Sequence, residues 1–140
     1  MIEALEASAL AEHLRRSRWT YPLVSAGHIA GIALLFGAAV PMAVESLRRG
    51  SAAQAICQRL RPFAMVGLAI AVICGALLFI AQASDYLQNR WFLAKLALVA
   101  LALANAALHF RAAPLGAPAA FASILLWAAA LVAGRMIAFA

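Results

Sequence analysis

The stretch YPLVSAGHIAGIALLFG, residues 21–37, is an apolar run that holds a single histidine, His28. The run continues to residue 44, and similar runs follow at 62–83, 91–110 and 118–138. Each is 20 to 24 residues long, which is enough for a helix to cross a hydrocarbon core of about 30 Å. Because the runs are continuous and not alternating, they predict transmembrane helices and not barrel strands.

The composition supports the same class of protein. Hydrophobic residues make up 67% of the 140 residues and charged residues 11%, against roughly 25% charged in an ordinary soluble domain. Short links between the runs require neighbouring helices to be antiparallel. We therefore predict an all-α fold, a four-helix up-down bundle in the membrane, over residues 19–140. The longest link, 45–61, is polar and has room for another short interfacial helix.

Residues 1–18 differ from a cleavable signal peptide, which opens with positive charge. Here the acidic residues come first and the arginines last, an order that matches the dipole of a helix. One side of the segment is loosely apolar. We predict a short amphipathic helix on the bilayer surface, with Trp19 and Tyr21 at the interface where the first span begins.

The net charge of +6 comes mainly from arginines between the apolar runs. Such residues meet lipid head groups and influence topology, so we expect a lipid bilayer as partner and no nucleic acid. We call the membrane side that holds the N-terminus side A and the opposite side side B. Their arginines are Arg15, Arg16, Arg18 and Arg90 on side A, and Arg48, Arg49, Arg59, Arg61 and Arg111 on side B. This near balance favours a cytoplasmic side B only weakly.

Polar residues inside the spans are the candidates for a functional site, because charged groups are rare in a bilayer and usually functional. They are His28, Lys95, Asn105, His109 and Arg135. His28 is about two turns from side A, Lys95 is about one turn into the third span, and Arg135 is in the last turn of the fourth. These three residues fall in one leaflet, and we predict that they gather at one site.

The third span carries its polar groups on one stripe, since Lys95, Asn105 and His109 fall within about 80° of one another. We expect this stripe to face the bundle interior, and Asn105 is therefore a candidate cofactor-binding residue. Lys95 and His109 are about 21 Å apart along the axis, so His28 and His109 are not expected to ligate one haem iron. His109 also fits an interfacial residue, and Lys95 and Arg135 also fit snorkelling side chains.

Small residues recur at four-residue spacing, with Gly27 and Gly31 in the first span and Gly67, Ala71 and Gly75 in the second. Such ridges let helix backbones approach closely in lipid. A second interpretation is that Gly27, Gly31 and Gly75 leave a shallow surface beside His28 for a flat cofactor. The spacing is compatible with both.

The pattern WTYP, GHIAGIALLFGA and then RWFLAKLALVALALANAALHF resembles an uncharacterised bacterial family of four-helix membrane proteins. The resemblance covers roughly residues 14–112 and implies a multi-pass protein of the bacterial inner (cytoplasmic) membrane. This chain departs from the family at residues 45–48, where Glu-Ser-Leu-Arg stands in place of an aspartate-leucine-arginine turn.

An early histidine in helix one and an early lysine in helix three also resemble two better-known groups. One is the HemJ-type protoporphyrinogen oxidase, a four-helix membrane protein that holds haem b. The other is the membrane domain of CopD-type copper-resistance proteins. The positions that match the HemJ pair are His28 and Lys95. The aromatic and proline-arginine-leucine signature after the HemJ histidine is missing here, which argues against the same enzyme activity.

The first hypothesis is a haem b protein that carries out one-electron transfer, an oxidoreductase-type component of the membrane. His28 ligates iron, and Lys95 is either the second ligand or a cation beside the propionates. Arg135 suits the propionate role, and the glycines make room for the macrocycle. A quinone or a partner redox subunit is then the expected electron partner.

Two alternatives remain. Copper handling of the CopD type requires soft ligands, and Met42, Met65 and Cys74 are the available ones. The other alternative is an accessory structural subunit without a cofactor, whose apolar and small-residue surfaces suit oligomer formation, including a homo-oligomer. The sequence contains no serine-histidine-acid, paired-carboxylate or phosphate-loop pattern, so soluble-type hydrolytic chemistry is not expected.

Overall fold

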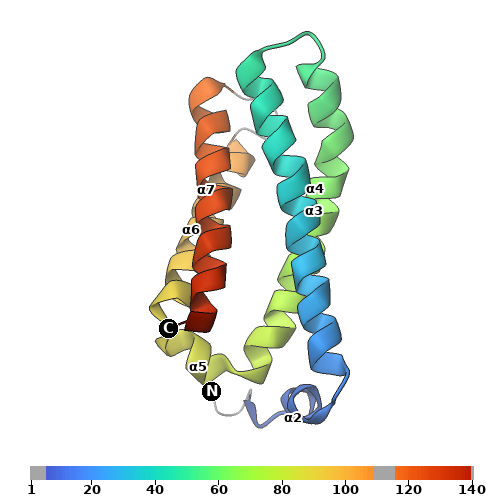
Figure 1. Cartoon of the computed structure of the whole chain (residues 1–140), viewed down its shortest axis with the longest axis vertical. Coiled ribbons are helices and arrows are strands. Elements are labelled where there is room, and N and C mark those ends of the chain that lie inside the picture. The colour runs from blue at the N-terminus through green and yellow to red at the C-terminus, as the bar shows by residue number, and fades with distance from the viewer. Residues whose placement is uncertain (1–5, 109–115, 140) are drawn as a thin grey trace.

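The computed structural model describes residues 6–108 and 116–139, and this part of the chain is helical and contains no strand (Figure 1). The helices are α2 (Ala9–Arg16), α3 (Thr20–Arg48), α4 (Ala53–Ala81), α5 (Ala83–Gln88), α6 (Arg90–Leu108) and α7 (Ala117–Met136), followed by the 3-10 helix η1 (Ile137–Phe139). The predicted fold, an all-α four-helix bundle after a short N-terminal helix, is confirmed.

Four helices are long and apolar enough to cross a membrane, namely α3, α4, α6 and α7 with η1. Their mean hydropathies are 2.0, 2.8, 1.9 and 1.9. The chain is therefore a multi-pass membrane protein. α3 and α4 have 29 residues each, or about 44 Å at 1.5 Å per residue. α6 has 19 residues, or about 28 Å, and the α3–α4 hairpin extends beyond it in Figure 1.

The segment 45–61 contains no separate interfacial helix, so that prediction is wrong. α3 continues to Arg48, α4 begins at Ala53, and the link between them is residues 49–52. Small side chains explain the extension, because Ala43, Ser46, Ala53 and Cys57 are all buried and let the helices stay close beyond the apolar run. The Ser46 hydroxyl donates to the Met42 carbonyl at 2.7 Å.

α3 and α4 touch backbone to backbone at Gly31 and Gly67. A Cβ atom at Gly31 would lie 2.6 Å from the Ala71 backbone nitrogen, and one at Gly67 would lie 2.5 Å from the Leu35 backbone nitrogen. Neither distance is compatible with a side chain. The small-residue ridge therefore packs helix against helix, as close-packed transmembrane pairs do.

α6 and α7 form the second tight pair, and α7 also contacts α3. Asn105 Nδ2 donates to the Ala119 carbonyl at 3.1 Å and ties α6 to the start of α7. No Cα atoms of α4 and α6 approach within 8 Å in the described residues. Aromatic rings bridge them instead near side A, where the Phe79 and Phe92 centroids are 5.6 Å apart and Tyr86 lies 5.1 Å from Phe92.

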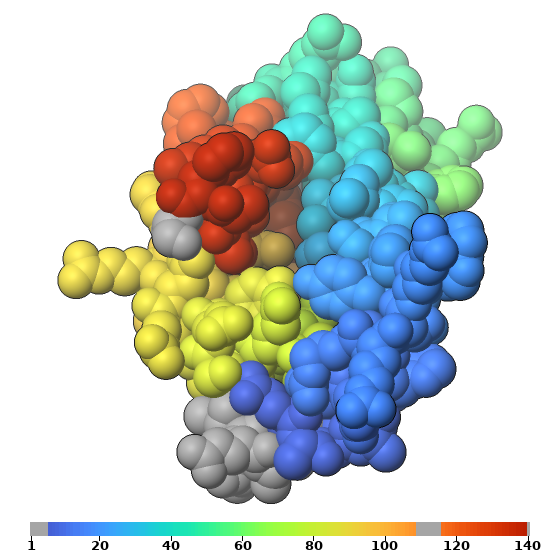
Figure 2. All heavy atoms as spheres, turned by 60° about the horizontal axis from the view of Figure 1, so that its bottom comes forward, coloured from blue at the N-terminus to red at the C-terminus, as the bar shows by residue number. Residues whose placement is uncertain are grey.

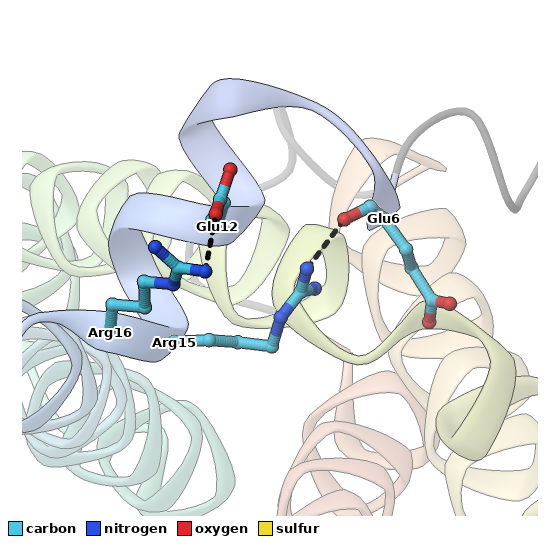
Figure 3. Close-up of polar contacts among 4 residues, drawn as sticks. All are labelled: Glu6, Glu12, Arg15 and Arg16. Carbon is cyan, nitrogen blue, oxygen red and sulfur yellow. Dashed lines mark hydrogen bonds and ion pairs between the residues drawn. The ribbon is translucent and has the colours of Figure 1, made fainter.

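The N-terminal segment is fastened to the side A end by Arg15 and Glu6. Arg15 donates to the carbonyl of Ala81, the last residue of α4, at 3.0 Å and to the Glu6 carbonyl at 2.7 Å (Figure 3). The Glu6 carboxylate accepts from the Ser84 backbone N–H at 2.8 Å and from its hydroxyl at 2.7 Å. Leu14, on the apolar side of α2, is buried, so this side of the helix packs on the bundle.

Replacing Gly67 by alanine is expected to destabilise the bundle, because the added methyl meets the Leu35 backbone, which cannot rotate away. Overpacking of this kind costs about 1–3 kcal/mol or more. Thermal unfolding of the purified protein in detergent measures the effect. Gly37→Ala is the matched control, since nothing lies within 4 Å of a Cβ atom at Gly37. Equal melting temperatures for the two variants would contradict the close backbone contact.

The attachment of the N-terminal segment is expected to weaken in acid. The hydrogen bond from the Ser84 backbone N–H is the main cause that lowers the pKa of Glu6 below its ordinary value of 4.5. A lowered pKa means that the stabilisation is present above the ordinary value and disappears as pH falls through the lowered one. Hydrogen exchange of the α2 amides, normalised to unstructured rates, should therefore rise below that range.

In Glu6→Gln, the α2 amides should exchange faster at neutral pH, with little further change in acid. Glu12→Gln is the control, because Glu12 only pairs with Arg16 on the exposed surface at 3.0 Å (Figure 3). If Glu12→Gln removes the pH dependence and Glu6→Gln keeps it, the assignment to Glu6 is wrong.

Candidate functional site

His28 is oriented by α4. Its Nδ1 lies 2.8 Å from the Ala71 carbonyl oxygen, and because a carbonyl can only accept, Nδ1 carries the hydrogen and donates it. In the neutral ring the lone pair is therefore on Nε2. The ring packs on Gly75, where a Cβ atom would lie 3.0 Å from Cε1. Any larger residue at position 75 would move the imidazole.

Lys95 meets His28 from the other helix pair. Its Nζ is 3.5 Å from His28 Nε2, so the amine of α6 faces the lone pair of the histidine of α3. The lysine side chain passes Gly134 of α7, where a Cβ atom would lie 3.4 Å from Nζ and 3.5 Å from Cδ. Each of the four spans thus contributes to the site: α3 gives His28, α4 gives the Ala71 carbonyl and Gly75, α6 gives Lys95, and α7 gives Gly134.

The other predicted site residues lie elsewhere. Arg135 is exposed, and its guanidinium carbon is 4.9 Å from the centroid of the Phe139 ring. Asn105 is ten residues after Lys95, or about 15 Å along α6, and binds the Ala119 carbonyl. Gly27 faces the Cys74 sulfur, and Gly31 faces the α4 backbone. His109 is outside the described residues.

Gly134 and the Ala71 carbonyl were missed as site groups by the sequence interpretation. Ala71 belongs to the predicted small-residue ridge of α4, so spacing did place it on the face towards α3. Its role in holding His28 is a backbone role, and side-chain identity carries no signal for that. Gly134 lies against Lys95 and directly precedes Arg135 in the sequence. The charge of Arg135 is a sequence signal for a functional site, whereas a glycine in an apolar span is not.

Aromatic rings lie between this site and side A. Phe92 is three residues before Lys95 on α6, and Phe79 is four residues after Gly75 on α4, so each is about one turn from the site. Asn89 holds the start of α6, because its Oδ1 accepts from the Trp91 N–H at 2.9 Å and its Nδ2 donates to the Ile137 carbonyl at 3.2 Å.

Tyr86, in α5 at the edge of this ring cluster, is a neutral phenol at physiological pH. Burial raises its pKa to about 12 because a phenolate would be poorly solvated there. Figure 2 looks onto this end and shows a recess between α7 (red), α3 (blue) and the yellow-green segment around α5. The ring cluster therefore lies about one helical turn from the site on its side A flank, and this end of the bundle is not closed.

The donor set is small. The described residues contain no group of three or more His, Cys, Asp or Glu side chains that could hold a metal ion, so an ordinary protein-ligated metal centre is not built there. His28 and Lys95 together offer two nitrogens that face one another.

Lys95 is the only lysine of the chain, so amine-reactive esters report on it alone apart from the N-terminus. We expect slow modification in the folded protein, because Nζ faces His28 and the chain lies against Gly134. Arg90→Lys supplies an internal reference on the exposed start of α6. The introduced amine should react much faster than Lys95, as read by peptide mass spectrometry. Equal rates would contradict the partly buried site.

Comparison with known proteins identifies no relative: no protein-family model, curated protein or solved structure matches this chain. The resemblances to the uncharacterised bacterial family, to HemJ and to CopD therefore stay predictions. The contacts of His28 and Lys95 are the basis on which a function is inferred.

Proposed function

We propose that this membrane protein binds haem b at His28 and Lys95 and serves as a one-electron component of a membrane redox system. The observation that carries the proposal is the orientation of His28. Its Nδ1–H is held by the Ala71 carbonyl at 2.8 Å, which leaves Nε2 as the metal-binding nitrogen. Metal-ligating histidines have their other ring N–H held by such an acceptor.

His28 Nε2 and Lys95 Nζ face each other at 3.5 Å, so these two residues would hold the iron of a bound haem. Gly75 and Gly134 keep both ligand side chains free of bulky neighbours. The α4 and α6 backbones stay apart in the described residues, and the Phe79 and Phe92 rings occupy part of the space between them near side A.

Each residue of the site would then have a defined role. His28 would hold the haem through Nε2, the Ala71 carbonyl fixes the histidine tautomer, and Lys95 would be a second ligand as a neutral amine. The ring cluster of Phe79, Tyr86 and Phe92 lies on the side A flank of the site. Arg135 is at the same end of the bundle and suits a propionate. When bound, haem supplies one-electron chemistry whose potential depends on its axial ligands.

The cellular setting belongs to the same proposal. We place the protein in the bacterial inner membrane, with a quinone or a partner redox subunit as the electron partner. Copper handling has less support, because Met42 and Met65 line a cavity towards side B, whereas Cys74 lies beside Gly27 in the other half of the bundle. The suggested soft ligands therefore do not form one set.

The test is the absorption spectrum of the full chain, purified in mild detergent from haem-supplied cells, before and after addition of dithionite. We expect a Soret band and a reduced α band. His28→Ala should abolish both bands, and His13→Ala should leave them intact, because His13 is on the surface helix α2. Lys95→Leu, which cannot ligate iron, should keep the pigment and convert low-spin six-coordinate iron to a five-coordinate form.

Each alternative has its own result. A colourless protein that does not take up added haem overturns the haem proposal. Stoichiometric copper in that protein would favour the CopD-like alternative, and a protein without haem or copper would favour an accessory subunit. A pigment whose spin state is unchanged in Lys95→Leu would overturn the role of Lys95 as a ligand and leave that of His28.

A further inference from the structure

A second site lies in the half of the bundle towards side B, away from His28 and Lys95. It is a cavity of about 330 Å³ between the two helix pairs, and all four spans line it. Its walls are mainly apolar and include Leu35, Met42, Met65, Leu68, Leu103 and Trp127. The volume is at the lower end of the range for ligand-binding pockets, roughly 300–1,000 Å³.

The shape of the cavity matches an amphiphile. Among its lining residues, Arg61 is the one with a charge. Arg61 is also the lining residue at the side B border of the apolar part of α4. On α4 the wall runs from Cys57 to Leu68, eleven residues or about 16 Å along the helix axis, and Arg61 lies within it. One cation in a mainly apolar cavity is the complement of an anionic head and an acyl chain.

The charge around the entrance has the same sign. Residues 45–61 carry four arginines, Arg48, Arg49, Arg59 and Arg61, and one acid, Glu45. Glu45 is occupied by Arg48 at 3.1 Å. Clusters of arginine at a membrane surface attract anionic lipids by about 1 kcal/mol per charge. The side B end of α3 and α4 therefore attracts anionic lipid to the half of the bundle that contains the cavity.

We propose that this cavity binds one acyl chain of an anionic phospholipid, with the lipid phosphate at Arg61. An apolar cavity between membrane-spanning helices favours an apolar occupant, because an empty apolar space forfeits the dispersion contacts of its walls. A neutral isoprenoid would fill the cavity equally well, but it would have no electrostatic attraction to Arg61 or to the other arginines of residues 45–61. The site does not depend on the haem proposal, since neither His28 nor Lys95 lines it.

Native mass spectrometry of the full chain in neutral detergent measures binding directly. Dioleoyl-phosphatidylglycerol is the anionic probe and dioleoyl-phosphatidylcholine the zwitterionic one. We expect phosphatidylglycerol to be retained preferentially. Arg61→Gln should weaken its binding by more than the roughly fivefold of one surface charge, because it also removes the phosphate contact in the cavity. Arg61→Lys should restore most of the preference. Arg59→Gln is the matched control, because it removes a surface charge outside the cavity and should weaken binding by that fivefold at most.

A second pair of variants tests the cavity itself. Ala64 lines the cavity, whereas Ala69 on the same helix is exposed and does not. Ala64→Phe should reduce retention of phosphatidylglycerol, and Ala69→Phe should not. The proposal is overturned if the two lipids bind equally, or if Arg59→Gln weakens binding as much as Arg61→Gln. Displacement of the lipid by a neutral isoprenoid quinone with unchanged affinity in Arg61→Gln would also overturn it.

Discussion

The close contact between the α3 and α4 backbones at Gly31 and Gly67 is the constraint on which the rest of the structure depends. With no side chain between them, the Gly31 position lies against the Ala71 backbone. His28 is one turn before Gly31 and therefore reaches the Ala71 carbonyl itself. A bulkier pair of residues would move the helices apart, and the histidine would lose the acceptor that sets its tautomer. Helix packing and the proposed chemistry thus depend on the same glycines.

The same contact makes the bundle uneven. α3 and α4 close on each other, α6 and α7 close on each other, and the backbones of α4 and α6 stay apart in the described residues. The interior seam between the pairs then holds two different sites. Near side A it is filled by His28, Lys95 and the aromatic ring cluster. Towards side B it stays open as the apolar cavity that Arg61 lines. Polar groups at one end and free volume at the other separate the two proposed functions.

Sequence reasoning was most successful where one physical rule dominates. Lipid requires each span to satisfy its own backbone hydrogen bonds, so apolar runs of about 20 residues were sufficient to identify four helices. The ends of the helices were less predictable. Residues 45–61 are polar by composition but helical by packing, because Ser46 and Cys57 fit between the helices as small side chains. The polarity of a segment predicts where the chain leaves the membrane for water. Where a helix ends depends also on the neighbouring helix against which it packs.

The candidate site was partly predictable for a similar reason. Leaflet depth placed His28 and Lys95 at one level, and the structure brings their nitrogens to 3.5 Å. Depth in the membrane does not decide in which direction a side chain points at the end of a helix. The Arg135 side chain points outward, over the Phe139 ring. The stripe of α6 placed Asn105 inside the bundle, but its partner is the Ala119 carbonyl. Periodicity locates a face and says nothing about what that face meets.

The amino-acid sequence by itself therefore determined the class of protein, the four spans and the identity of the polar groups within the membrane. These are consequences of hydrophobicity and of the 1.5 Å helical rise, which act within one segment. Only the tertiary structure decided which carbonyl holds His28, that Gly134 accommodates Lys95, and that Arg61 borders a cavity. Those contacts join residues that are far apart in the chain, and they arise from how closely pairs of helices can approach.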